Sequence, residues 1–245
     1  MKARRVKKLD SKAPFAENAA RIIRVRLAEM RSFVPAALEL ESSRDQHDMR
    51  IAAKRLRYVL ESTEACFGKP AQFARRRAKD LQAVLGDLHD CDVMLPRVEA
   101  HLAELREQDA EGMWRRAGAA ADLDPELAAR APNRTSFRGL DVLAVYLRAR
   151  RRLLFDRFTD FWAEQERAGT WDELDQEAAK LLRDAKERRR AARRAERAER
   201  RLVEAEQERR AAADRAHAAV AHLERAERVA DTRLRGTLRP GGMQG

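Results

Sequence analysis

The segment from residue 47 to residue 58, HDMRIAAKRLRY, carries basic residues at a spacing that can bind a polyanion. Successive helical residues turn by about 100°, so residues three and four apart share one side. That side would carry His47, Arg50, Lys54 and Arg57. Because Arg forks onto two anionic oxygens and Lys acts as a point charge, the row suits regularly spaced phosphates. The alternative is an ordinary solvated charged side of a helix.

A second segment, residues 79–93, carries residues that would complete such a site. One stripe of this helix would hold Lys79, Gln82, Gly86 and His89, while leucines occupy another stripe. A glycine inside a helix costs about 1 kcal/mol relative to alanine, and its usual benefit is close approach of another backbone or a ligand. We therefore expect the two stripes to face a shared groove.

The apolar pattern predicts the elements that would hold these residues. Helices are expected over residues 15–38, 44–67, 72–107 and 137–167, and a long connection with room for a short helix over residues 108–136. Pro35 should end or bend the first helix, Ser43 starts a capping-box pattern, and Gly68-Lys69-Pro70 should stop the second helix. Four amphipathic helices in succession predict an all-α four-helix bundle.

A long Ala/Arg/Glu-rich helix is predicted to follow. Thr170 opens a second capping-box pattern, and no Gly or Pro interrupts the sequence from there to Arg235. Spacings of four and three relate a series of positions that are all Ala or Leu except Arg209, namely 191, 195, 198, 202, 205, 209, 212, 216, 219, 223, 226 and 230. This pattern favours a weak coiled-coil seam and a homodimer through the C-terminal helix. A solvated single helix that is stabilised by Glu–Arg ion pairs along its length is an equal alternative.

Charge is unevenly distributed along the 245 residues, whose formal net charge is +11. Residues 1–12 hold six basic and one acidic residue, and residues 183–201 hold ten and four. We expect a basic disordered tail over 1–12, a helical domain over 13–182, a long helix or coiled coil over 183–235 and a disordered C-terminus over 236–245.

The two cysteines and the hydropathy pattern indicate in which cellular compartment the protein is expected. Cys66 and Cys91 have no metal-like spacing and give no disulfide framework, which favours a reducing environment. No apolar run reaches signal-peptide or membrane-spanning length. We therefore expect a soluble, cytoplasmic protein without membrane contact.

Two motifs in the chain resemble those of the CHAD family, which is named for its conserved histidines and α-helical fold. They are the segment from His47 to Glu61 and the later segment LQAVLGDLHDCDV, residues 81–93. The resemblance extends over about residues 13–182. It implies an all-helical bundle that binds inorganic polyphosphate along a basic surface, often at polyphosphate granules. The site residues implied by position are His47, Arg50, Lys54, Arg55, Arg57, Lys79 and His89, to which charge and helix placement add Arg21, Arg24, Arg148 and Arg151.

The chain also departs from the family pattern. CHAD domains typically carry two copies of the four-helix repeat with a basic cavity between them, whereas this chain has one basic row before the C-terminal helix. We hypothesise that dimerisation through residues 183–235, or the basic tail itself, supplies the missing half. His89-Asp90 stands where the family commonly has Arg-Asp, so the charge at this point depends on pH.

The sequence also bears on functions other than polyphosphate binding. The sequence has no Gly-rich phosphate loop and no Cys or Ser motif with a partnered base, so we expect a non-catalytic protein without cofactor or metal. Asp87, His89, Asp90 and Asp92 resemble a hard-metal cluster, but consecutive helical positions do not converge. The alternatives are sequence-independent nucleic-acid binding through the Arg-rich run over residues 188–194, and a coiled-coil scaffold.

Overall fold

The computed structural model describes residues 2–237, and for residues 231–237 it describes the helical backbone alone. The elements are α1 (Phe15–Arg31), α2 (Val34–Ala37), α3 (Ser43–Ala117), α4 (Glu126–Ala129), α5 (Arg134–Arg167) and α6 (Thr170–Thr237). All regular structure within residues 2–237 is helical, so the predicted all-α class with a long C-terminal helix is confirmed. Residues 238–245 of the expected disordered C-terminus lie outside the described residues.

The chain divides into two compact units, Met1–Ala185 and Lys186–Gly245. The boundary falls within α6, whose first turns therefore belong to the N-terminal unit. Across the described residues, no helix combines the length and the apolar character that crossing a membrane requires.

Pro35 divides the predicted first helix into two elements. α1 ends at Arg31, and α2 begins at Val34 with Pro35 in its first turn. Proline lacks a backbone N–H and fixes φ, so it fits the first turn of a helix and interrupts a longer one. The prediction that this residue ends or bends the helix is confirmed.

The segment before α1 contacts that helix, contrary to the predicted disorder of residues 1–12. The backbone N–H of Arg4 donates to Oε1 of Glu29 at 2.9 Å, and Arg26 Nη2 donates to the Arg4 carbonyl at 2.8 Å. The Glu29 side chain is buried, and a buried carboxylate requires hydrogen-bond donors. This requirement holds the segment around Arg4 against α1.

α3 is a helical hairpin that reverses at Gly68. The backbone there has φ 61° and ψ −143°, a positive φ that glycine adopts readily, and Pro70 lies in the first turn of the following half. Contacts join residue 47 to 89, 57 to 82 and 64 to 75. The two halves, residues 43–67 and 69–117, therefore run antiparallel, and the predicted break at Gly68-Lys69-Pro70 is confirmed.

The start of α3 does not form the predicted capping box. Ser43 is already helical, and Ser42 at the N-cap makes no side-chain hydrogen bond to the helix. The Gln46 side chain is buried; its Nε2 donates to the Glu39 carbonyl at 2.8 Å and its Oε1 accepts from Arg151 Nη2 at 3.3 Å. Because a buried amide needs partners, Gln46 joins the α2–α3 loop to α5 instead of capping α3.

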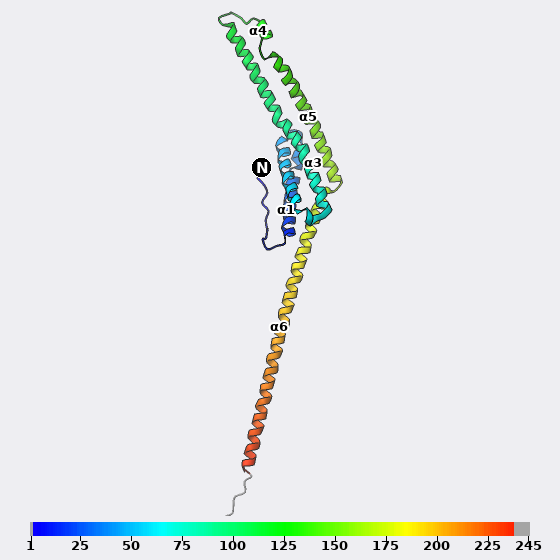
Figure 1. Cartoon of the computed structure of the whole chain (residues 1–245), viewed down its shortest axis with the longest axis vertical. Coiled ribbons are helices and arrows are strands. Elements are labelled where there is room, and N and C mark those ends of the chain that lie inside the picture. The colour runs from blue at the N-terminus through cyan, green and yellow to red at the C-terminus, as the bar shows by residue number, and fades with distance from the viewer. Residues whose placement is uncertain (1, 238–245) are drawn as a thin grey trace, which may run out of the picture. The chain divides into compact units, whose positions relative to one another are not determined.

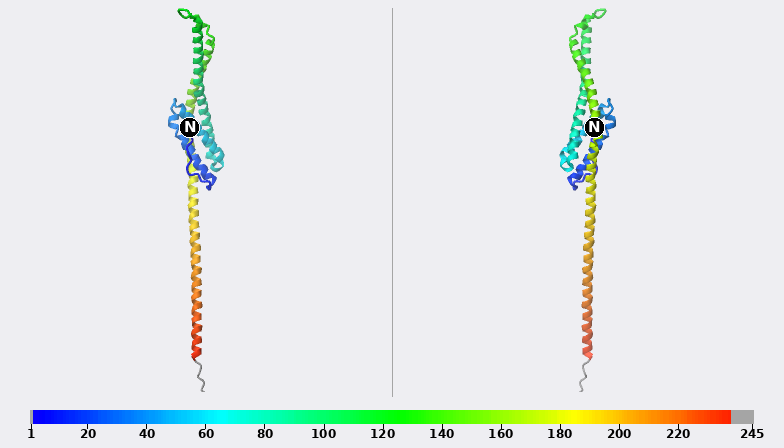
Figure 2. Two further views of the ribbon diagram at one scale, coloured as in Figure 1. Left: turned by 90° about the vertical axis from the view of Figure 1, so that its left-hand side faces the viewer. Right: turned by 90° about the vertical axis from the view of Figure 1, so that its right-hand side faces the viewer.

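The second half of α3 and α5 lie side by side, with α4 in the connection between them (Figure 1). Figure 2 shows the same pairing from two other sides. The connection is shorter than predicted because α3 continues to Ala117, beyond the expected end near Glu107. Helix formation persists until Gly118, where a positive φ of 58° ends it, and α5 already begins at Arg134.

One apolar core joins the helices of the N-terminal unit. α1, both halves of α3 and α5 contribute Ile23, Met49, Leu85 and Phe158, which are almost fully buried. The first turns of α6 add Trp171, whose ring stacks on that of Trp162 with centroids 6.0 Å apart. The start of α6 is therefore a further helical segment in the core, beside the four that were predicted.

The second predicted capping box is not formed either. Gly169, with φ 67°, turns the chain between α5 and α6. Thr170 Oγ1 donates to Gln165 Oε1 at 3.0 Å, and the Glu173 N–H donates to the Gly169 carbonyl at 2.9 Å. Thr170 is buried, so its hydroxyl pairs with the neighbouring buried amide of α5 and not with the backbone of its own helix.

The C-terminal unit is a continuous stretch of helix within the described residues. From residue 186 to residue 230 every side chain is exposed except the half-buried Ala221. Ion pairs four residues apart, Arg200–Glu196 at 2.9 Å and Arg210–Glu206 at 2.8 Å, lie along it. Such pairs stabilise an isolated helix by a few tenths of a kcal/mol each.

Candidate functional site

The two polar stripes predicted from the sequence face each other across the α3 hairpin. The rings of His47 and His89 lie with centroids 4.3 Å apart, and Arg57 Nε donates to Gln82 Oε1 at 3.1 Å. We call the surface formed by His47, Arg50, Lys54, Arg57, Lys79 and His89 the basic face. Its first four residues span ten helical positions, or about 15 Å of helix.

Gly86 makes room for a side chain of the basic face. A Cβ at this position would lie 3.3 Å from Arg50 Nε and 3.9 Å from Arg50 Nη2. The close approach expected at this glycine is therefore made by a guanidinium group from the opposite half of α3. A larger side chain at residue 86 would push Arg50 away from the hairpin.

Apolar residues behind the basic face fix its position. The opposite sides of the two α3 halves carry Met49, Ala53, Leu56 and Leu60, and Leu81, Leu85 and Leu88, all at most 1% exposed. Burial of several leucines, each stabilising by about 2 kcal/mol, resists rotation of either half about its axis. The basic side chains are consequently held at the surface without depending on a loop.

Three cations of the basic face have no acidic partner among the described residues. Arg50, Lys54 and Lys79 form no ion pair there, whereas Arg57 Nη1 lies 2.6 Å from Glu61 Oε1. Glu61 lies one helical turn after Arg57, at the end of the basic face that is nearest Gly68. The basic face therefore carries an excess of positive charge, although residues 13–182 as a whole hold 28 basic and 29 acidic residues.

His47 adds a pH-dependent charge to this face. Burial lowers the pKa of His47 from its ordinary value of 6.5, and the nearby His89 and Arg50 lower it further, while Asp48 opposes them. The Nδ1 of His47 is buried without a hydrogen-bond partner among the described residues. A bound anion would favour the protonated imidazole and oppose these effects.

Tyr58 contacts two cations of the basic face, and the sequence did not predict this. Its ring lies 4.5 Å from the guanidinium carbon of Arg57 and 5.8 Å from Lys54 Nζ. Cation–π contacts of this kind restrict two flexible side chains without neutralising them. The available signal was its spacing, because Tyr58 follows Lys54 by one helical turn.

Three other predicted site residues lie away from the basic face and pair with carboxylates. Arg55 Nη1 donates to the buried Glu29 Oε1 at 3.1 Å, and Arg21 Nη2 donates to Glu17 Oε2 at 3.1 Å. Arg24 binds both oxygens of Asp175, at 2.8 and 3.2 Å. The contacts of Arg55 and Arg24 join α1 to α3 and α6, and that of Arg21 lies within α1. All three arginines are thus engaged in contacts that hold the fold together.

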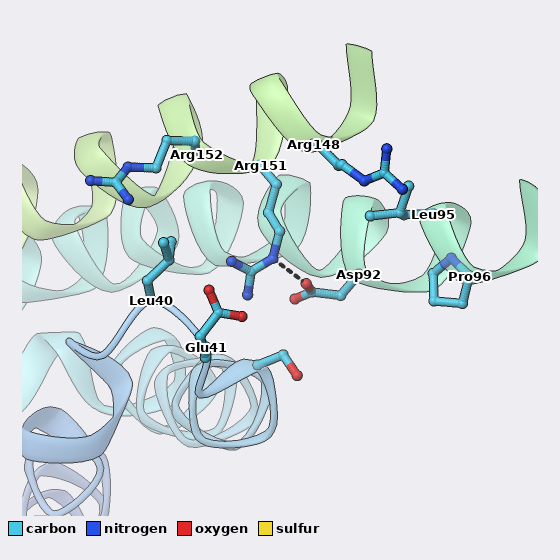
Figure 3. A pocket seen from close by; sticks show the side chains of 9 residues that line it. Leu40, Glu41, Asp92, Leu95, Pro96, Arg148, Arg151 and Arg152 are labelled. Carbon is cyan, nitrogen blue, oxygen red and sulfur yellow. Dashed lines mark hydrogen bonds and ion pairs between the residues drawn. The ribbon is translucent and has the colours of Figure 1, made fainter. Parts of the chain in front are cut away.

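Arg148 and Arg151 line a separate pocket of about 470 Å³ beside α5, together with Arg152, Glu41 and Asp92 (Figure 3). Arg151 Nε donates to Asp92 and its Nη2 to Gln46, while Arg148 pairs with Glu99. Both predicted arginines are therefore already engaged by acidic groups of α3. The structure does not bring them to the basic face.

The acidic residues of the proposed metal-like cluster point to different partners. Asp87 accepts from Arg150 Nη2 at 3.3 Å, and Asp92 from Arg151. Within the described residues, no three His, Cys, Asp or Glu side chains gather closely enough to hold a metal ion.

The α3 hairpin and its basic face define an all-α domain with a cationic surface held between two antiparallel helices. Residues 2–99 match the family model of the CHAD domain, and this match confirms the resemblance drawn from the two motifs. The match contains the whole basic face and ends before α5, so Arg148 and Arg151 lie outside it. Searches of the curated proteins and of the solved structures found no match.

Proposed function

We propose that the protein binds inorganic polyphosphate non-catalytically along the basic face. The CHAD domain is associated with polyphosphate binding in general. The observation that carries the proposal is the contrast in pairing: Arg50, Lys54 and Lys79 form no ion pair with any described residue, while the other predicted arginines sit against carboxylates. Unpaired cations gain more from an incoming anion, because no existing ion pair has to be broken.

The geometry of the row suits an elongated ligand. Helical residues three and four apart place their Cβ atoms about 5–6 Å apart, so neighbouring cations can bind different phosphates of one chain. Arg50 and Arg57 can each fork onto two oxygens, and Lys54 acts between them as a point charge. Affinity should therefore rise with chain length until about 15 Å of ligand fills the row, and then level off.

A binding titration with matched variants tests this function. The variant Arg50→Gln/Lys54→Gln/Lys79→Gln should lower the affinity of the full chain for long-chain polyphosphate by roughly a hundredfold, since each charge-assisted contact is worth about 1 kcal/mol or more. The control is Arg24→Gln/Arg148→Gln, which removes exposed arginines that are already paired. Equal losses in the two variants would refute a specific role for the basic face.

Sequence-independent nucleic-acid binding through α6 is the second candidate. It is supported by the exposure of Arg188, Arg190, Arg193 and Arg194 on one stretch of helix, because such a run can follow phosphates by charge alone. Competition between polyphosphate and duplex DNA at physiological salt separates the two functions. Preference for polyphosphate, lost in the triple variant, supports the basic face; equal affinities that survive the triple variant support α6.

We further propose that binding takes place in the cytoplasm at polyphosphate granules. This setting follows from the proposed ligand. Fluorescence microscopy of the tagged chain tests it, with the triple variant as the control. Equal granule labelling by both proteins would contradict recruitment through the basic face.

A further inference from the structure

The C-terminal unit carries an apolar seam whose side chains are exposed in the part of the chain that the structure describes. In heptad lettering, the d positions are the alanines at 191, 198, 205, 212, 219 and 226, and the a positions are Ala195, Leu202, Arg209, Ala216, Leu223 and Ala230. Leu202 and Leu223 expose 72% and 64% of their surface. A repeat of this kind over several heptads is the pattern by which helices pair, with small d residues allowing close approach.

We propose that this seam binds a second copy of the same chain as a parallel, in-register coiled coil. In such a coil, each g residue faces the e residue of the next heptad on the other helix. Arg194 would then face Glu199, and Arg201 would face Glu206. The other g–e pairs between residues 187 and 227 include His222 opposite Glu227, and none of them brings like charges together.

Other arrangements of the same helix fit the charges less well. A shift by one heptad would place Glu208 opposite Glu206, and Glu187 opposite Glu199. An antiparallel pair would place e residues opposite e residues, and the e positions from 192 to 227 contain Glu, Ala and Val but no cation. Like charges across a helix interface oppose pairing, so the charge pattern favours the parallel, in-register dimer.

The ion pairs of the single chain agree with this assignment. Arg200 and Glu196, on the side away from the seam, pair with each other at 2.9 Å. Arg194, Glu199 and Arg201, which border the seam, form no ion pair among the described residues, whereas Glu206 pairs with Arg210 of its own helix at 2.8 Å. Three of these four border charges are therefore available for a second helix, and Glu206 would have to exchange Arg210 for Arg201 of the second copy.

Two further features match a helix partner. A hollow lined by Arg194, Arg197, Ala198, Arg201 and Leu202 lies on this helix and includes the seam residues Ala198 and Leu202. Arg209 interrupts the apolar seam at an a position, where it can reach Glu208 of the second copy. A single polar residue at an a position lowers stability but specifies the register and the number of strands.

Sedimentation equilibrium of the full chain, without any phosphate ligand, tests the proposal. The expected result is a concentration-dependent monomer–dimer equilibrium in the micromolar range. Arg194→Glu/Arg201→Glu and Glu199→Arg/Glu206→Arg should each lose the dimer, because like charges then face each other. An equimolar mixture of the two variants should regain it. Monomers at all concentrations, or a mixture that fails to associate, would overturn the proposal.

The matched control reverses charges on the other side of the same helix. Glu196→Arg/Arg200→Glu keeps the composition and the intrahelical pair, so it should leave the dimer unchanged. Circular dichroism of every variant shows whether helix content is retained. Loss of the dimer in this control would mean that charge reversal acts on the helix itself and would contradict the assigned seam.

A cysteine at the seam tests direction and register. Ala198→Cys in a Cys66→Ser background should form a symmetric disulfide under mild oxidation, because the parallel, in-register dimer brings residue 198 of both copies together, whereas an antiparallel dimer that pairs the whole of residues 186–230 does not. The remaining Cys91 is buried. Chains that dimerise but do not cross-link at this position would overturn the parallel register. Since no polyphosphate is present, the result is independent of the proposed function.

Discussion

The rings of His47 and His89 lie with their centroids 4.3 Å apart and their planes tilted by 46°, so two imidazoles from opposite halves of α3 share one end of the basic face. Two protonated rings at this distance would repel each other, and burial of His47 adds to that cost. An anion above the pair would offset both effects. Proton uptake and phosphate binding should therefore be coupled at this position.

Polyphosphate affinity should increase as the pH falls below 6.5, the ordinary pKa from which that of His47 is lowered. Bound phosphate favours the protonated ring, so binding takes up protons in this range. Titrations between about pH 7.5 and about pH 5.5 measure the slope. His47→Gln should flatten it, while His101→Gln, at an exposed position on the same helix, should not.

The same histidine should make the unliganded fold less stable in acid. The pKa of His47 is lower in the folded chain than in the unfolded chain, so the unfolded state binds more protons below pH 6.5. The associated stability is fully present above pH 6.5 and is lost as the pH falls. Urea unfolding at several pH values checks this, and His47→Gln should show a weaker acid dependence. An unchanged dependence would contradict the assignment.

Gly86→Leu should weaken polyphosphate binding by displacing Arg50. The added side chain would occupy the space that Arg50 Nε approaches to 3.3 Å, so the guanidinium must leave its position over the hairpin. The expected loss of affinity equals that of Arg50→Gln. Ala83→Leu, at an exposed position one turn earlier, is the control. Equal effects at residues 83 and 86 would argue against a positioning role for the glycine.

Glu61→Gln should strengthen polyphosphate binding. The carboxylate lies 2.6 Å from Arg57 Nη1 and competes with an incoming phosphate. An exposed ion pair is worth at most about 1 kcal/mol, so the gain should be roughly twofold to fivefold. Isothermal titration measures it, with Glu111→Gln as the control because that residue forms a similar i,i+4 pair with Arg115.

Glu29→Ala should destabilise the N-terminal unit by about 3 kcal/mol, because it leaves cations without their shared buried carboxylate. Glu29 is 1% exposed and binds Arg26, Arg55 and the backbone of Arg4. Glu166→Gln, which removes an exposed partner of Arg31, should change stability by less than about 0.5 kcal/mol. Denaturant unfolding compares the two variants. Similar losses would contradict a special role for Glu29.

Residues that share one helix could be placed from the sequence because helical periodicity fixes their side. The row from His47 to Arg57 and the break at Gly68 follow from spacing and from backbone chemistry. That the two stripes face each other was inferred from their polarity and from Gly86, and the contacts of His47 with His89 and of Arg57 with Gln82 confirm it.

The pairing of individual charges could not be predicted in the same way. Glu29 lies 26 positions from Arg55, and Asp175 lies 151 positions from Arg24. Such contacts depend on how helices cross, which local sequence does not encode. The two predicted capping boxes did not form because Gln46 and Thr170 bind other groups: Gln46 Nε2 donates to the Glu39 carbonyl, and Thr170 Oγ1 donates to Gln165 Oε1.

Gly68, which reverses α3, also fixes how the second half of the helix is rotated about its own axis. Each residue added to a helix rotates all later side chains by about 100° and advances them by about 1.5 Å. One residue inserted after Gly68 would carry His89, Gln82 and Lys79 together around to the leucine side, with no change in their identity. The length of this turn therefore determines which side of the second half of α3 faces the first half. Natural variants with one residue more or fewer here should differ in ligand affinity even where every basic residue is kept.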